Sequence, residues 1–202
     1  LKRIWPDFTT TILDTGVGED VRYISMDERI YWSDGVGKTG VIDNGLPRTW
    51  GIEVPAISSV TATAGTLTAG TYGVVITHER SDGQESGAGI SQAVTVADGG
   101  GFTVTWAAPS DSSIERVNIY VSDQNSTTLY KVGSTPASTA TYTYSGGVLG
   151  RTLDTQWLEP PQACSNITDF RGRIYMSVGE YVFASTVFGY ELYDLRDYHA
   201  ID

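Results

Sequence analysis

The side chains best suited to nucleophilic or metal chemistry are few in this sequence: one cysteine, Cys164, and two histidines, His78 and His199. A Ser-His-Asp triad needs a histidine within reach of a serine and an acid, and a zinc site needs ligands at short, characteristic spacings. The sequence shows neither pattern. We expect His78 to face solvent from a strand, and Cys164 to be a small buried or half-buried residue.

The acidic residues are numerous but do not outline a site. Asp194, Asp197 and Asp202 could supply oxygen ligands to Ca²⁺, yet no EF-hand or repeated calcium loop surrounds them, so a charged segment is the favoured interpretation. Paired carboxylates for glycoside cleavage remain open, because strand ends bring distant acids together, but nothing selects one pair. Residues 99–101 are three glycines between strands, which predict a turn and not a phosphate loop. We therefore expect no enzyme, no cofactor and no metal.

Exposed aromatic side chains could bind a sugar, so the tyrosines need a separate assessment. Tyr142 and Tyr144 fall on one face of a predicted strand, and Tyr120 and Tyr130 lie on nearby strands. Packing in the core and across strands is the favoured interpretation of these positions. A glycan of a host surface stays an alternative partner.

The composition limits the class of protein. The chain has 202 residues, 23 Gly, 12 Tyr, one Cys and a formal net charge of −11. Without clustered Lys and Arg it is not suited to binding nucleic acid. We expect neither a signal peptide nor a membrane span, since no long apolar stretch occurs. The abundance of strand and turn formers, with no 3.6-residue apolar period, predicts an all-β protein.

One short sequence occurs twice and organises the two ends of the chain. Residues 29–35 read Arg-Ile-Tyr-Trp-Ser-Asp-Gly, and residues 173–179 read Arg-Ile-Tyr-Met-Ser-Val-Gly. Each copy follows a polar turn and precedes a second strand-like run, so each predicts a β-hairpin. The shared residues form the candidate structural site: Arg29, Ile30, Tyr31, Ser33, Gly35, Arg173, Ile174, Tyr175, Ser177 and Gly179.

Alternation along these strands places Ile30 and Trp32 on one face and Tyr31 and Ser33 on the other. The second copy repeats the pattern, so both faces of each hairpin carry a bulky residue. This is what a sheet packed between neighbouring sheets requires, as in a β-propeller blade. An ordinary strand that is buried on both faces is the alternative.

Prolines mark a change of composition between the copies. Pro47 and Pro55 predict a connector that leaves the first sheet, and Pro160 and Pro161 lead back. Six or seven short strands at spacings of about ten residues lie between and predict a β-sandwich. We expect residues 1–54 and 161–202 to form a discontinuous propeller-like antiparallel body of partial blades, with a sandwich at residues 55–160. The sequence starts with Leu1 and ends in strand-like sequence, as a fragment of a longer protein would.

The inserted segment resembles a fibronectin type III domain, an immunoglobulin-like sandwich. The residues that carry this resemblance are a Gly-Thr-Tyr strand, a turn, a Trp-centred strand and an Asn-Ile-Tyr strand, at residues 69–77, 82–86, 104–109 and 117–122. In that family the Trp-centred strand normally comes early and the Gly-Thr-Tyr strand late. Here the order is reversed, as in a circular permutation.

The same order is similar to modules of bacteriophage structural and tail proteins. There a Gly-Thr-Tyr strand, a Gly-Gln-Glu-Ser turn, an Asn-Ile-Tyr strand and a Leu-Gly pair precede a Pro-Pro linker and a Gly-Arg-Ile-Tyr hairpin; here these features span roughly residues 65–195. The resemblance implies a structural component of the virion, in the tail, that contacts other virion proteins and further copies of itself. The alternatives are an extracellular or cell-surface carbohydrate-binding module and a fragment of a propeller glycosidase.

Two shorter resemblances point to propellers of other kinds. Residues 31–34 are similar to the Tyr-Trp-Thr-Asp motif of receptor-type six-bladed propellers, which supports a blade hairpin; a single cysteine does not fit the disulfide-bonded neighbours of those receptors. Residues 43–50 resemble the Asp-box turn of sialidases, but the leading Ser is missing and the spacing from Gly to Trp is too long.

Overall fold

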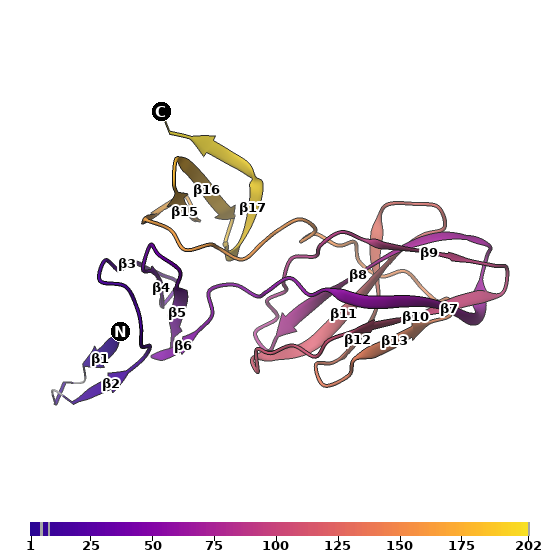
Figure 1. The fold of residues 1–202 in the computed structure, drawn as a ribbon, viewed down its shortest axis with the longest axis horizontal. Helices are drawn as coiled ribbons and strands as arrows, with labels where there is room; N and C mark the ends of the chain where they lie inside the picture. Colours follow the sequence, from indigo (N-terminus) through magenta and orange to yellow (C-terminus); the bar gives the residue numbers. More distant parts are fainter. Residues whose placement is uncertain (5, 8, 202) are drawn as a thin grey trace. The chain divides into compact units, whose positions relative to one another are not determined.

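The computed structural model describes residues 1–4, 6, 7 and 9–201, and its regular elements are all β-strands (Figure 1). The prediction of an all-β protein is confirmed. The chain divides into two compact units: Leu1–Ile52 with Glu159–Asp202, hereafter the repeat body, and Glu53–Leu158, hereafter the inserted unit. In the part of the chain that the structure describes, no helix is long and apolar enough to cross a membrane.

The repeat body contains two antiparallel sheets of four strands, each a meander in chain order. The first repeat sheet is formed by β3 (Arg22–Met26), β4 (Arg29–Ser33), β5 (Thr39–Asp43) and β6 (Leu46–Arg48). The second repeat sheet is formed by β14 (Asn166–Phe170), β15 (Arg173–Val178), β16 (Tyr181–Thr186) and β17 (Gly189–Ala200). A separate hairpin joins β1 (Lys2–Ile4) to β2 (Thr10–Ile12).

Tight turns fix the register of both meanders. Asp27 and Glu28 have φ of 49° and 62° between β3 and β4, and Arg171 and Gly172 have φ of 49° and 72° between β14 and β15. Two successive positive φ angles are the mark of a two-residue turn whose twist suits a hairpin. The two hairpins consequently pair alike, Tyr31 opposite Ile24 and Tyr175 opposite Thr168.

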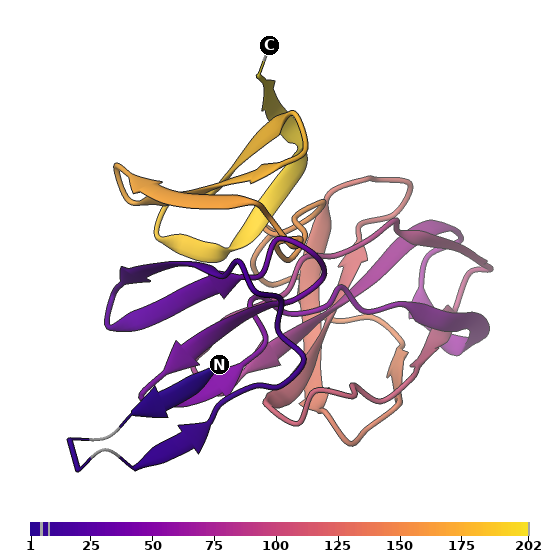
Figure 2. The ribbon, with the colours of Figure 1, turned by 60° about the vertical axis from the view of Figure 1, so that its left-hand side comes forward.

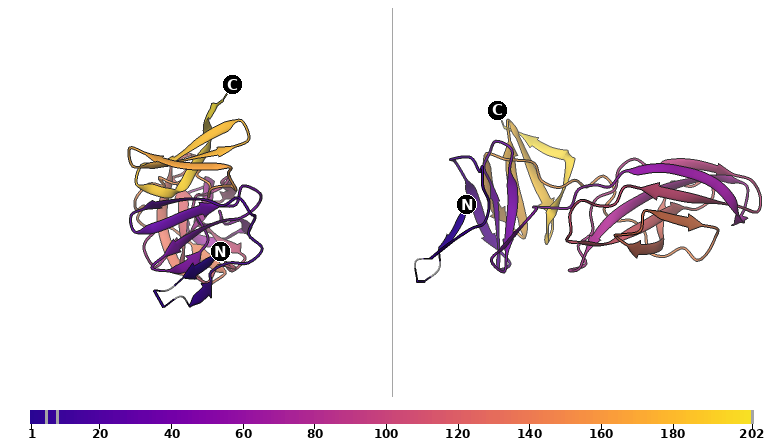
Figure 3. Two further views of the ribbon diagram at one scale, coloured as in Figure 1. Left: turned by 90° about the vertical axis from the view of Figure 1, so that its left-hand side faces the viewer. Right: turned by 60° about the horizontal axis from the view of Figure 1, so that its bottom comes forward.

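The two repeat sheets lie face to face within the repeat body (Figures 2 and 3). Side chains from both sheets and from the segments beside them form the core between the sheets, namely Tyr31, Val41, Trp50, Cys164, Ile174, Met176, Tyr190 and Tyr193. Partly buried residues of both sheets extend this core at its rim, among them Met26 and Ile167. Burial of each large apolar side chain of this kind stabilises the fold by about 1.5–3 kcal/mol.

The inserted unit has two antiparallel sheets that enclose a second core. One sheet has the order β13-β10-β7, from Thr141–Tyr144, Gly100–Trp106 and Ile57–Leu67; the other has the order β12-β11-β8-β9, from Leu129–Pro136, Ile114–Ser122, Gly70–Arg80 and Gln92–Val96. The buried residues recur with period two: Tyr72, Val74 and Ile76 on β8, Phe102, Val104 and Trp106 on β10, and Val117, Ile119 and Val121 on β11. This is the alternation expected of strands with one face toward a core.

The four-stranded sheet of the inserted unit is also covered on its opposite face. Val75, Ala88, Tyr120 and Leu129 form a smaller apolar cluster there, with Leu153 packed against it. Loop segments around Ala88 and Leu153 therefore close this face, which explains why β8 and β11 are nearly continuous runs of buried residues.

Four strands, β1, β6, β7 and β14, lie where the sequence suggested none. Leu46–Arg48, expected to be a connector, pairs with β5 as an edge strand, and an edge position tolerates Pro47 because its missing N–H is not needed for the ladder. β7 is a strand of 11 residues that is rich in Ala, Ser and Thr, with little apolar alternation to reveal it. β14 is polar and mostly exposed, so it has no hydrophobic pattern to predict.

Candidate functional site

The repeated residues are the candidate site, and the two copies use opposite faces. In the first copy Tyr31 is 0% exposed and lies in the core between the sheets, whereas Ile30 is 37% exposed. In the second copy Ile174 is 0% exposed and lies in that same core, whereas Tyr175 is only half-buried. The tyrosine face of the first repeat sheet therefore packs against the isoleucine face of the second.

The cause of this arrangement is the strict alternation of side chains across a strand. Ile24 and Val41 lie directly opposite Tyr31 on neighbouring strands and share its face. Ile167 and Phe183 lie opposite Met176 in the second repeat sheet and share the face of Ile174. The contact joins unlike faces of two like sheets, which is the pattern of a heterologous interface and not of a two-fold one.

The serine and glycine that the two copies of the repeat share shape the turn that follows it. Gly35 and Gly179 have φ of 72° and 58°, a region that favours glycine. Ser33 Oγ accepts hydrogen bonds from the backbone N–H of Cys164 at 2.8 Å and of Gly35 at 3.2 Å. Ser33 thus joins the first hairpin to the segment that leads into the second repeat sheet. Ser177 Oγ lies 3.3 Å from Ser165 Oγ.

Asp34 organises the turn of the first hairpin through its carboxylate. It accepts backbone N–H groups of Val36, Gly37 and Lys38 at 3.0, 2.9 and 2.8 Å, and that of Gly18 at 3.1 Å. These backbone hydrogen bonds, led by Gly37 and Lys38, hold the pKa of the Asp34 carboxyl well below its ordinary value. The second copy has Val178 at this position and a shorter turn, so the carboxylate serves the first copy alone.

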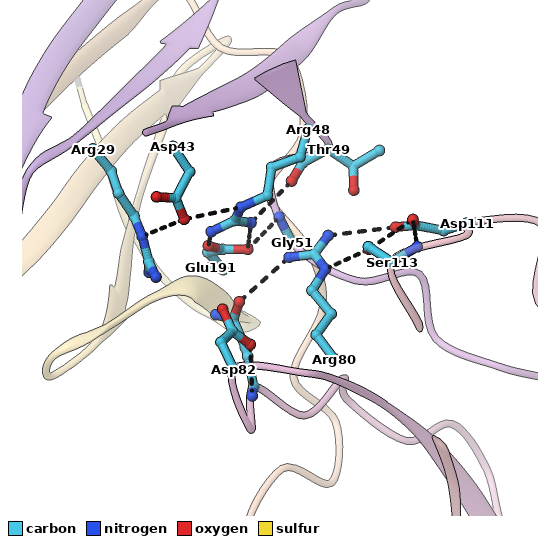
Figure 4. A network of polar contacts seen from close by, with 11 residues as sticks. Arg29, Asp43, Arg48, Thr49, Gly51, Arg80, Asp82, Asp111, Ser113 and Glu191 are labelled. Carbon is cyan, nitrogen blue, oxygen red and sulfur yellow. Dashed lines mark hydrogen bonds and ion pairs between the residues drawn. The ribbon is translucent and has the colours of Figure 1, made fainter. Parts of the chain in front are cut away.

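A chain of ion pairs connects the two repeat sheets (Figure 4). Arg29 Nε on β4 lies 2.9 Å from Asp43 Oδ2 on β5, which lies 3.6 Å from Arg48 Nε on β6. Arg48 then reaches β17, where its Nη1 and Nη2 donate to the two carboxylate oxygens of Glu191 at 2.8 and 2.5 Å. Such a bidentate pair is geometrically specific and strong.

Glu191 is the buried end of this chain, 1% exposed. Its Oε2 also accepts the backbone N–H of Gly51 at 3.0 Å (Figure 4). Nearby, Trp50 Nε1 donates to the carbonyl of Tyr190 at 2.9 Å. A buried carboxylate needs a partner charge and hydrogen bonds to offset its desolvation. Arg48 and Gly51 supply them, and the arrangement holds the segment 48–51 against β17.

The inserted unit contains its own buried carboxylate, Glu85, which is 8% exposed. It accepts hydrogen bonds from Asn118 Nδ2 at 2.9 Å, Tyr120 OH at 2.8 Å and Thr77 Oγ1, and forms an ion pair with Arg151. The donors come from β8, β11 and the segment after β13, so Glu85 fastens two loops over the four-stranded sheet. Glu85 therefore has a structural role in the inserted unit.

Opposing effects act on the pKa of Glu85. Burial acts to raise the pKa of its carboxyl, but the hydrogen bonds from Thr77, Asn118, Tyr120 and Arg151 outweigh burial and hold that pKa below its ordinary value. Burial and the adjacent Glu85 charge raise the pKa of Tyr120. Glu85 is therefore an ionised acceptor and Tyr120 a neutral donor at neutral pH.

Cys164 and His78 are buried, whereas His199 is exposed. Cys164 is 1% exposed, as expected, and burial raises the pKa of its thiol. His78 was expected to face solvent, and this is wrong: it is 8% exposed, because it lies on the same core-facing side of β8 as Val74 and Ile76. Burial lowers the pKa of His78. His199 lies on the exposed end of β17.

The acids that were considered as Ca²⁺ ligands do not form a metal site in the described part of the chain. Asp194 forms an ion pair with Arg196 at 2.7 Å within a bulged part of β17, and Asp202 falls outside the described residues. Among residues 1–4, 6, 7 and 9–201, no three His, Cys, Asp or Glu side chains gather closely enough to hold a metal ion.

The tyrosines considered for sugar binding pack into the fold. Tyr120 and Tyr144 are 0% and 6% exposed, and Tyr144 packs against Phe102 with ring centroids 5.6 Å apart. Tyr142 is partly buried and donates to the carbonyl of Val132 at 3.1 Å. Packing is therefore confirmed for Tyr120, Tyr142 and Tyr144.

Sequence reasoning missed the residues that tie the structure together: Arg48, Glu85 and Glu191. Arg48 and Glu191 are 143 positions apart, and no local pattern links them. The turn chemistry of Asp34 was accessible, since an Asp before Gly commonly accepts the backbone N–H groups of a turn.

Searches of known protein families and of curated proteins find no match to this sequence.

Proposed function

We propose that this chain is a structural component of a bacteriophage particle, in its tail, with a propeller-like repeat body and a fibronectin type III-like inserted unit that contacts other proteins or the host surface. The observation that carries the proposal is the packing of two equivalent hairpins through unlike faces. Repetition of that kind builds scaffolds from stacked sheets.

The polar groups of the repeat body support the same reading. Asp34 is saturated by backbone N–H groups, and Glu191 by Arg48 and Gly51. Their carboxylates hold turns and sheets together. In the inserted unit, two antiparallel sheets of three and four strands around one core are consistent with a fibronectin type III-like sandwich.

Purified particles from the source of this sequence provide the test. Mass spectrometry of gradient-purified virions should detect the chain in constant proportion to the other tail proteins, and antibody labelling should place it on the tail. A protein that is absent from purified particles, although it is expressed during infection, would refute the proposal.

A second candidate function, a cell-surface carbohydrate-binding module, is favoured by one exposed aromatic pair. Tyr181 and Tyr198 are 44% and 51% exposed, and their ring centroids lie 4.9 Å apart. Exposed aromatic rings can stack on sugars. Binding to a defined glycan on an array, lost in Tyr198→Ala but kept in Tyr23→Ala, would support this candidate; the absence of any bound glycan would refute it.

A further inference from the structure

The outer face of the second repeat sheet is equivalent, position by position, to a face that is buried elsewhere in this chain. Phe170, Tyr175 and Ser177 occupy the positions of Met26, Tyr31 and Ser33. Ala184, opposite Tyr175, takes the place of Val41, opposite Tyr31. In the first repeat sheet this face forms the core between the sheets; in the second, Phe170 is 58% exposed.

The complementary face is also present in the same chain, and part of it is exposed. Tyr23, Ile30 and Trp32 in the first repeat sheet occupy the positions of Ile167, Ile174 and Met176, which contact the tyrosine face in the observed core. Tyr23 is 72% exposed and Ile30 is 37% exposed, whereas Trp32 is 3% exposed. Each copy of the chain therefore carries both halves of an interface that it has already used once internally.

We infer that the repeat body associates head to tail with a second copy of this chain, the outer face of the second repeat sheet docking on the outer face of the first repeat sheet of the next copy. The inference rests on the proposed structural function. An interface between unlike faces leaves one free face at each end, so it extends to a ring or a filament.

The β1–β2 hairpin lies beside one end of the docking face. It faces Ile30 and Ile42 across a hollow of about 320 Å³, lined also by Lys2, Arg3 and Leu13. The row formed by Tyr23, Trp32 and Gly40 lies one step further along the sheet. Gly40 gives Trp32 room, because a Cβ there would lie 2.6 Å from its indole. Trp32 and Gly40 are buried within the chain, so the docking position that we assign to the partner's sheet is the exposed part of this face, at Tyr23 and Ile30.

Sedimentation velocity of the full chain over a wide concentration range tests the inference. The wild type should show mass-action association beyond the monomer. Phe170→Arg and Tyr23→Arg, one on each docking face, should each weaken association by about tenfold or more, as expected for a charge placed at the centre of an apolar contact. Tyr181→Arg is the matched control: it is exposed on the same sheet but shares the face of Met176, and it should associate like the wild type.

Mixing the two impaired variants separates a head-to-tail contact from a symmetric one. Tyr23→Arg retains an intact second-sheet face and Phe170→Arg an intact first-sheet face, so the mixture should form a heterodimer and nothing larger. A symmetric contact of second sheet with second sheet would leave Tyr23→Arg unimpaired and would overturn the inference. Circular dichroism checks folding, and Thr168→Arg, exposed on the same face as Tyr175, replaces Phe170→Arg if that variant does not fold.

A wild type that stays monomeric at every concentration overturns the inference, and so does an equal loss of association in Tyr181→Arg. These outcomes are distinct from failure of the proposed function. A monomeric protein that is nevertheless found in virions refutes the head-to-tail contact alone, whereas self-association of a protein missing from virions refutes the virion assignment alone.

Discussion

The two copies of the repeat share five of seven residues, yet their shared residues have opposite surroundings. Tyr31 and Ile174 are fully buried in one core, while Ile30 and Tyr175, the equivalent residues of the other copy, retain contact with solvent. The repeat thus specifies a hairpin that is apolar on both faces, and the position of a sheet in the stack decides which face is covered.

The largest contrast is expected between two arginines. Arg48→Ala leaves the buried Glu191 carboxylate without its counter-charge, which should lower the free energy of unfolding of the repeat body by about 3–5 kcal/mol. Arg173→Ala removes only a hydrogen bond to the Ser185 carbonyl from the outer face and should cost about 1 kcal/mol. Amide hydrogen exchange of β4 and β15, read by mass spectrometry, measures both. Equal losses would show that the ion-pair chain does not hold the sheets together.

The tyrosines of the repeat should differ almost as much. Tyr31→Ala opens a cavity in the core and should destabilise the repeat body by about 3–5 kcal/mol, as for other large aromatic residues. Tyr175→Ala, at low protein concentration, should cost less than about 1 kcal/mol. Urea unfolding followed by fluorescence is a suitable measurement, because Trp50 packs against Tyr31 with ring centroids 5.5 Å apart. A larger effect at Tyr175 would reverse the assignment of faces.

For the isoleucines of the repeat, substitution should cost more stability in the second copy than in the first. Ile174→Ala should cost about 2–5 kcal/mol because the residue is enclosed by the core, and Ile30→Ala about 1 kcal/mol or less because the residue is partly exposed. The same urea titration measures both variants. The tyrosine should matter more in the first copy and the isoleucine more in the second. Larger losses of stability in the same copy for both residue types would contradict burial of opposite faces.

Acid should affect the two copies unequally, because only the first has a carboxylate in its turn. The folded-state pKa of Asp34 is depressed, so its contribution to stability is present above the ordinary carboxyl pKa of about 4 and is lost as the pH falls toward the folded value. Asp34→Asn should therefore reduce the loss of stability of the repeat body below about pH 4. Asp20→Asn, at an exposed ion pair with Arg22, is the control and should leave the pH dependence unchanged. An unchanged profile in Asp34→Asn would contradict this role.

Much of the fold could be predicted because it is local. Alternation and turn residues located β3, β4, β8, β10, β11 and β13 to within a few residues, and these features are encoded in neighbouring positions. Among the strands that escaped prediction, β7 and β14 have polar or small side chains and no apolar period.

The site could be predicted only in part. The doubled hairpins and the shared residues of the repeat are visible in the sequence, but the same alternation describes both faces. Which face is buried depends on the neighbouring sheet. The pairing of Arg48 with Glu191, and the four donors around Glu85, arise from contacts between distant segments that no spacing encodes.

Hydroxyl-radical footprinting of the native protein at low concentration, read residue by residue by mass spectrometry, shows which face of each repeat hairpin is buried. Packing through opposite faces predicts strong labelling of Ile30 and Tyr175 and protection of Ile174 and Tyr31. Protection of the same residue type in both copies, both tyrosines or both isoleucines, would contradict it.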